Sequence, residues 1–164
     1  MTSFRLTADY VAPMDPAGSI HSPGYVDVAG GLVTSCGPLA SAPPPADGAE
    51  VLAVGGLLMP GMINAHDHPQ LYEDDYQNAH LQASSAYKTL RSLAALQSWL
   101  LAGWTTVRVM GDGDVFYGNM DLKRAVDEGL FTAPRLTGAA HYISTTGGGG
   151  DMHFISPEQG VTPD

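Results

Sequence analysis

In residues 1–50, short apolar runs alternate with clusters of glycine, proline, serine and aspartate. Residues 4–11 alternate loosely between apolar and polar side chains, as a strand does. Residues 25–28 and 32–36 are two apolar runs on either side of Gly30-Gly31, which is a hairpin signal. A proline-rich stretch over 38–48 predicts a loop. The pattern therefore predicts short β-strands in this part of the chain.

A helical pattern follows over residues 85–102, where apolar side chains recur at the spacing of one helix face. Ser84 or Ser85 can cap the start of this helix, and Gly103 can end it. The apolar stripe consists of Tyr87, Leu90, Leu93, Ala94, Leu100 and Leu101, and Lys88 and Arg91 are expected to lie off it.

Strand and helix signals then repeat towards the C-terminus. The residues in 105–110 are largely β-branched and predict a strand. A short helix is predicted over 120–129, capped by Asn119 or Asp121, and a third strand over 136–144. Strand–helix–strand units imply parallel strands joined by right-handed crossovers.

The stretch over residues 51–69 combines apolar runs with two closely spaced histidines. We expect a buried strand that ends in His66-Asp67-His68. Side chains two positions apart on a strand share a face, so both imidazoles can converge on one metal ion. Asp67 points the other way and is expected to make structural hydrogen bonds. The H-x-H pair by itself is a weak signal, because two histidines can fall together by chance.

Charge and composition exclude several functions. The formal net charge of −10 argues against binding to nucleic acid or to an anionic membrane surface. No apolar run approaches the ~20 residues that span a bilayer, and no secretory signal opens the chain. Cys36 is the single cysteine, which excludes an intrachain disulfide and suits a reducing compartment. We therefore expect a cytoplasmic protein.

The context of the histidine pair is more specific than the pair itself. Residues 58–68 resemble the first barrel strand of the amidohydrolase superfamily, which often reads L-x-P-G-x-I-D-x-H-x-H; here Asn64 replaces the aspartate. Residues 101–108 resemble the second-strand pattern L-x-x-G-x-T-T-V-R. Residues 133–151 resemble the third strand of the prolidase-like and imidazolonepropionase-like branch, which continues into T-G-G-H-G-D. Gly149 stands where that branch has histidine.

This resemblance implies an α/β fold. Residues 1–54 would be the N-terminal part of a small β-sandwich, although a generic hairpin explains them nearly as well. Residues 55–164 would be the first three strands and two helices of a TIM-like (β/α)8 barrel. The polar stretch over 69–84 is then expected to be a loop beside the substrate, because loops after the strands form the active-site face of such barrels.

The resemblance also implies the chemistry. One or two divalent metal ions, zinc being the expected one, would be held by His66 and His68. Metal-activated water would hydrolyse an amide, a cyclic amide or a related C–N bond of a small molecule. Asp112, His141, Asp151 and His153 could add ligands, but no spacing requires it. The family's catalytic aspartate and metal-bridging lysine have no matching position here, so no catalytic base is assigned.

The chain is short for such an enzyme, because a complete barrel needs about 250 residues. We therefore expect a second polypeptide that carries the remaining strands, either a product of the same precursor or a separate subunit. The alternative is a catalytically inactive truncated domain that self-associates through its open sheet edges. A β-rich metal-binding module such as a cupin also uses H-x-H, but the helical patterns count against it.

Overall fold

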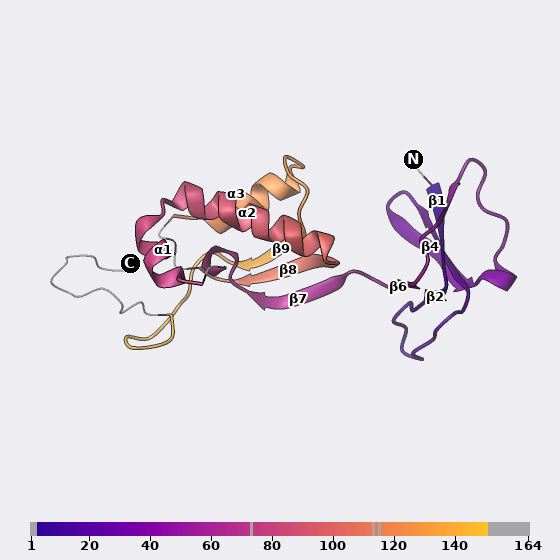
Figure 1. Cartoon of the computed structure of the whole chain (residues 1–164), viewed down its shortest axis with the longest axis horizontal. Helices are drawn as coiled ribbons and strands as arrows, with labels where there is room; N and C mark the ends of the chain where they lie inside the picture. The colour runs from indigo at the N-terminus through magenta and orange to yellow at the C-terminus, as the bar shows by residue number, and fades with distance from the viewer. Residues whose placement is uncertain (1–2, 73, 113, 115, 151–164) are drawn as a thin grey trace. The chain divides into compact units, whose positions relative to one another are not determined.

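The computed structural model describes residues 3–72, 74–112, 114 and 116–150 (Figure 1). The chain divides into two compact units, Met1–Pro60 and Gly61–Asp164. The boundary predicted from the sequence, between residues 54 and 55, lies slightly earlier. The first unit consists of strands and a short 3-10 helix, whereas the second is mixed α/β. None of the helices in the described part of the chain is long and apolar enough to cross a membrane.

The first unit is built on a four-stranded sheet with the order β4-β3-β1-β5. Strand β1 (Ser3–Ala8) pairs antiparallel with β3 (Gly24–Ala29) and parallel with β5 (Glu50–Ala53). Strand β3 continues into β4 (Leu32–Pro38) through Gly30 and Gly31, which both have positive φ angles. The predicted hairpin is therefore confirmed. A 3-10 helix, η1 (Leu39–Ser41), follows β4.

A partly buried ion pair joins the neighbouring strands β1 and β3 of this sheet. The guanidinium of Arg5 donates two hydrogen bonds of 2.7 Å to the carboxylate of Asp27, and it lies over the ring of Tyr25 at 4.7 Å. It also donates to the carbonyl oxygen of Pro43, in the proline-rich loop. The carboxylate and the hydrogen bond to Asp27 raise the pKa of Arg5, so the side chain stays charged although it is largely buried.

The apolar run over 51–59 does not form one continuous strand. It divides between β5 and β6 (Leu57–Leu58), which pairs parallel with β2 (Tyr10–Val11). Gly55 and Gly56 separate the two strands with φ angles of +64° and +54°. Left-handed residues interrupt a strand, and Val51 and Leu57 are both more than half exposed.

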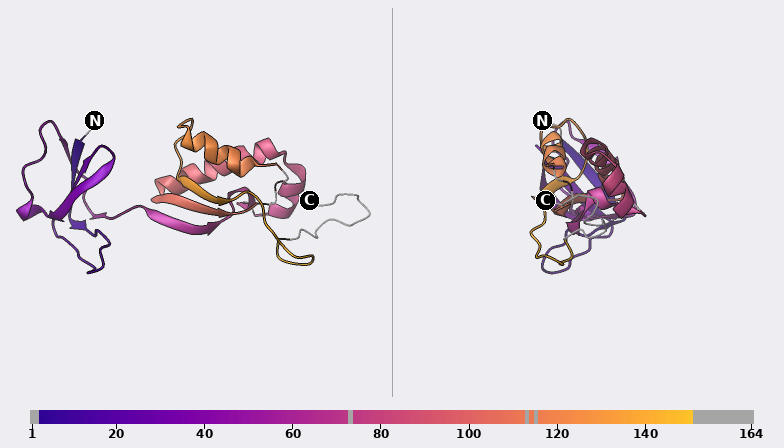
Figure 2. Two further views of the ribbon diagram at one scale, coloured as in Figure 1. Left: turned by 180° about the vertical axis from the view of Figure 1, so that it is seen from behind. Right: turned by 90° about the vertical axis from the view of Figure 1, so that its left-hand side faces the viewer.

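The second unit contains a parallel sheet with the order β7-β8-β9. Strands β7 (Met62–Asp67), β8 (Trp104–Met110) and β9 (Arg135–Ala139) are connected through helices α2 (Ser85–Leu101) and α3 (Gly118–Asp127). Both helices cover the same face of the sheet, as two further views show (Figure 2). The predicted succession of parallel strands and crossover helices is confirmed.

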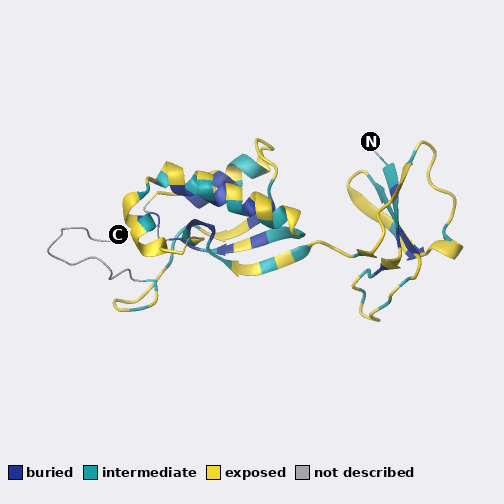
Figure 3. Cartoon of the chain, viewed as in Figure 1, coloured by how far each residue is buried: buried dark blue, intermediate teal, exposed yellow. Residues whose placement is uncertain are grey.

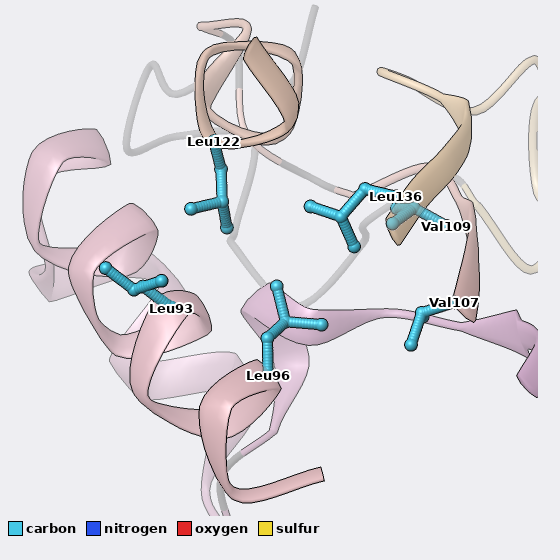
Figure 4. Packing of buried hydrophobic residues seen from close by; sticks show 6 residues of the cluster. All are labelled: Leu93, Leu96, Val107, Val109, Leu122 and Leu136. Carbon is cyan, nitrogen blue, oxygen red and sulfur yellow. The ribbon is translucent and has the colours of Figure 1, made fainter. Parts of the chain in front are cut away.

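The core of this unit lies between the sheet and the two helices. Alternate residues of β8, Val107 and Val109, point towards the helices. They meet Leu93 and Leu96 of α2 and Leu122 of α3 (Figure 4). Leu136 of β9 completes the cluster, with Trp99, Val126 and Ala133 packed against it.

Of the predicted apolar stripe of helix α2, only Leu93 is buried in the core. Ser84 caps the helix as expected, by accepting a hydrogen bond from the backbone N–H of Tyr87. However, Tyr87, Leu90 and Leu101 are exposed, and Lys88 is buried. The buried positions of the helix are Lys88, Ser92, Leu93 and Leu96. Its first turns therefore face a polar group, the carboxylate of Asp114 in the loop after β8, rather than an apolar layer.

Three other expectations about this unit are wrong in detail. The stretch over 69–84 is not simply a loop, because it contains η2 (Pro69–Leu71) and α1 (Tyr76–Gln82). The third strand ends at Ala139, where the chain turns so that Ala140 accepts a hydrogen bond from the backbone of Asp112. The helix α3 begins at Gly118 without a side-chain cap, because Asn119 donates instead to Asp112.

The strand β7 is largely exposed, whereas the sequence predicted a buried strand. None of its six residues is buried (Figure 3). Ile63 is 67% exposed. Among the described residues it pairs on one side only, with β8, and the helices pack mainly over β8 and β9. Parallel strands are normally buried on both faces, so this exposure is unusual for a strand of a parallel sheet.

Candidate metal centre

The two histidines of the H-x-H motif converge at the C-terminal end of β7. Their Nε2 atoms lie 3.3 Å apart, and their rings meet edge to face at 78° with centroids 5.2 Å apart. Two nitrogen ligands of a tetrahedral zinc ion, each about 2.0–2.1 Å from the metal, lie about 3.3 Å from each other. The positions of His66 and His68 therefore fit a shared divalent metal.

The imidazole of His68 is oriented from behind by the loop after β8. Its Nδ1 lies 2.6 Å from the carbonyl oxygen of Gly111. A carbonyl oxygen can only accept, so Nδ1 carries a hydrogen, and the neutral form of this ring has its lone pair on Nε2. Metal-binding histidines commonly hold their ring in this way, with the second nitrogen bonded to a carbonyl or a carboxylate.

Asp67 supports the motif from the other side of the strand. Its Oδ1 accepts a 2.7 Å hydrogen bond from the backbone of His68, and its Oδ2 accepts one from the amide of Asn64. The amide oxygen of Asn64 accepts in turn from the backbone of His66. Asp67 is thus the structural hydrogen-bonding residue that the sequence predicted. Asn64 is chemically matched to it, because an aspartate at position 64 would offer no donor.

A buried carboxylate lies behind His68. Asp112 is 1% exposed, and its Oδ1 lies 4.0 Å from Nδ1 of His68 without a hydrogen-bond partner in the described residues. Burial raises the pKa of Asp112 to about 6, against the opposing effects of the hydrogen bond from Asn119 and of His68. Asp112 lies on the Nδ1 side of His68 and is therefore not placed as a third ligand at Nε2.

Sequence reasoning missed Tyr142, which lies in the segment after β9. Its hydroxyl oxygen is 3.2 Å from Nδ1 of His68, and the two rings are in tilted contact with centroids 5.5 Å apart. Burial, together with the charge of Asp112, raises the pKa of Tyr142 to about 12, so the phenol is neutral. No motif marks this residue, because its role depends on how the loop folds back.

The other candidate ligands do not complete the site. His141 packs against the ring of Tyr117, with centroids 4.7 Å apart, and its Nε2 is buried without a hydrogen-bond partner among the described residues. Asp151 and His153 lie outside the part of the chain that the structure describes. Within the described part, no group of three or more histidine, cysteine or acidic side chains could hold a metal ion. His66 and His68 are therefore an incomplete donor set.

Solved structures of larger proteins share the fold of this chain. A prolidase complexed with N-methylphosphonate-L-proline is 26% identical, with a TM-score of 0.74 over 92% of this chain. An amidohydrolase is 25% identical, with a TM-score of 0.75 over 96% of this chain. The chain is similar to the amidohydrolase superfamily. The ochratoxinase of A. niger, 20% identical with a TM-score of 0.79, shares the fold over 96% of this chain.

The similarity to the amidohydrolase superfamily spans only part of those enzymes. The chain covers 35%, 37% and 36% of the prolidase, the amidohydrolase and the ochratoxinase, about a third of their length. No protein-family model matches the chain, and no curated protein sequence does either. The α/β units described above therefore correspond to one portion of a larger hydrolase fold.

Proposed function

We propose that this chain is the N-terminal portion of a metal-dependent amidohydrolase that cleaves an amide, a cyclic amide or a related C–N bond. The observation that carries the proposal is the 3.3 Å separation of the Nε2 atoms of His66 and His68 at the end of the first parallel strand. The structural neighbours with sequence identity of 25% or more include a prolidase and an amidohydrolase.

The described residues would hold the ion and orient its ligands. His66 and His68 would donate their Nε2 lone pairs, and the carbonyl of Gly111 fixes the tautomer that leaves Nε2 of His68 free. When bound, a divalent metal, zinc by preference, would lower the pKa of a water molecule and polarise the carbonyl of the substrate. Asp67 and Asn64 would keep the backbone of the motif in place through their mutual hydrogen bond.

The remaining ligands and the catalytic base would come from strands beyond those described. We propose that β7, β8 and β9 are the first strands of a (β/α)8 barrel, completed by a second polypeptide. The exposure of Ile63 on β7 and the one-sided pairing of β7 and β9 within the described residues support this. Exposed edge strands of this kind tend to pair with another chain, because their backbone groups are unpaired and their apolar side chains are exposed.

The proposal is tested by native mass spectrometry of the chain purified from its source with its bound partners, followed by denaturing mass spectrometry. We expect a second polypeptide and one or two zinc ions. The complex should hydrolyse members of a panel of Xaa-Pro dipeptides, cyclic amides and aryl amides. Loss of hydrolysis on treatment with a chelator, and its return with zinc, would tie the activity to the metal.

Self-association is the second candidate, and the exposed edge of β7 favours it as well. In that case native mass spectra would contain only copies of this chain, without stoichiometric metal and without hydrolysis of the panel. That result would refute the enzymatic proposal for this polypeptide. A homo-oligomer that retains zinc and hydrolyses an amide would instead refute only the requirement for a second polypeptide.

A further inference from the structure

Two loops that are distant in the sequence meet behind His68. Gly111 has a φ angle of +103°, and a Cβ at this position would lie 2.8 Å from the backbone carbonyl carbon of His141 and 3.0 Å from the backbone nitrogen of Tyr142. Only a residue without a side chain allows the loop after β8 and the segment after β9 to approach so closely. This backbone contact brings the phenol of Tyr142 to the imidazole of His68.

The hydrogen on Nδ1 of His68 has two acceptors. The carbonyl of Gly111, at 2.6 Å, requires that Nδ1 be protonated, so the hydroxyl of Tyr142 at 3.2 Å cannot donate to that nitrogen. The phenolic oxygen therefore acts as the second acceptor of a three-centre hydrogen bond from Nδ1–H. The tilted ring contact adds a steric limit on rotation of the imidazole. The imidazole of His68 is thus held both by the hydrogen bonds of its Nδ1–H group and by the ring of Tyr142.

We propose that Tyr142 is a positioning residue of the metal centre, which holds the imidazole of His68 so that its Nε2 faces that of His66. This inference rests on the proposed metal-binding function of the two histidines. Groups that hold the second nitrogen of a metal-binding histidine typically contribute tenfold or more to metal affinity, because they restrict the ring and set its tautomer. Tyr142 shares this task with Gly111, whose backbone carbonyl a side-chain substitution does not remove.

The test compares two tyrosine-to-phenylalanine variants in the full chain with its copurified partners. Tyr142→Phe removes the hydroxyl next to His68 and keeps the ring. Tyr117→Phe is the matched control, because the ring of Tyr117 packs on His141 rather than on His68. The affinity for Zn²⁺ is measured by competition with a chromophoric chelator, and folding by circular dichroism.

We expect Tyr142→Phe to bind Zn²⁺ about three- to tenfold more weakly than the wild type, with Tyr117→Phe unchanged. In ¹⁵N-histidine spectra of the metal-free protein, His68 should be the Nδ1–H tautomer, and its Nδ1 proton should shift in Tyr142→Phe only. Equal zinc affinity in the wild type and Tyr142→Phe, with no spectral change at His68, would overturn the inference.

Failure of the proposed function gives a different result. If the wild type binds no zinc, the metal proposal fails, while the histidine spectra of the metal-free protein still test the contact between Tyr142 and His68. If Tyr142→Phe does not fold, the inference is still testable, because it also predicts the tautomer of His68 in the wild-type protein. An Nε2–H tautomer of His68 in the wild type would refute it without any variant.

Discussion

Nε2 of His66 and Nε2 of His68 lie 3.3 Å apart, on side chains separated by one residue of an extended strand. If both imidazoles carry their hydrogen on Nδ1, the two Nε2 atoms at this distance present lone pairs to the same point, an arrangement that a shared cation stabilises. The other described histidines lie on separate segments: His21 in the first unit, His80 on α1 and His141 after β9. This relationship leads directly to a test of metal binding.

His66→Asn and His68→Asn should each weaken zinc binding about a hundredfold or more, because each removes one of the two described nitrogen donors. His21→Asn is the control and should bind zinc as the wild type does. The measurement is a zinc titration of the assembled protein by competition with a chelator. Binding that is unchanged in both motif variants would show that the metal, if present, is held elsewhere.

The departure from the family pattern at position 64 has a physical counterpart in the structure. Asn64→Asp would place a carboxylate against Asp67, replacing a hydrogen bond with repulsion between like charges. We expect a loss of about 1–2 kcal/mol in the free energy of unfolding at neutral pH. The loss should shrink on acidification, because a protonated carboxyl again supplies a donor.

Asn78→Asp provides a matched comparison, since Asn78 also donates to a carboxylate, that of Asp75, but on an exposed helix. Its effect should stay within about 0.5 kcal/mol, because solvent screens exposed charges. Urea denaturation at pH 7 and pH 4 measures both variants. Similar losses in the two variants at pH 7 would contradict a specific pairing of Asn64 with Asp67.

The sequence was most informative where local chemistry determines structure. The hairpin at Gly30-Gly31, the Ser84 cap and the strand–helix–strand order all follow from turn residues and periodicity, and the structure contains them. It was least informative where contacts between distant segments decide. Nothing near Tyr142 in the sequence indicates that it reaches His68, 74 residues away. Periodicity likewise could not show that Lys88 is buried, because its carboxylate partner lies on another element.

The end of β9 depends on a glycine that no other residue can replace. Gly138 has a φ angle of +117°, and a Cβ there would overlap the backbone carbonyl oxygen of Val109 in the neighbouring strand. Gly138→Ala should therefore lower the free energy of unfolding by about 3 kcal/mol or more, because the strands must separate to relieve the overlap.

Gly129→Ala separates this overlap from the cost of the backbone angle alone. Gly129 also has a positive φ, +76°, but a Cβ there would meet nothing within 4 Å. Its expected cost is about 1 kcal/mol. Thermal and urea unfolding of the two variants measure the difference. A Gly138→Ala protein as stable as Gly129→Ala would contradict the close approach of β8 and β9.

The buried ammonium of Lys88 is predicted to stabilise the fold by compensating the carboxylate of Asp114. The two side chains are 8% and 4% exposed, and Nζ of Lys88 lies 4.0 Å from Oδ1 of Asp114. Burial lowers the pKa of Lys88, and the charge of Asp114 opposes this shift. Lys88→Met should cost about 2 kcal/mol or more, because it leaves a buried carboxylate without its cation.

A double-mutant cycle isolates that pair. The double mutant Lys88→Met/Asp114→Asn should lose less free energy of unfolding than the two single mutants together, by about 1 kcal/mol or more. Removal of both charges leaves neither one unpaired. Lys123→Met is the control, because Lys123 pairs with Asp127 on the exposed face of α3 and should change stability by less than about 0.5 kcal/mol. Additive losses at Lys88 and Asp114 would show that the two groups are buried independently and that other charges near Lys88 neutralise it.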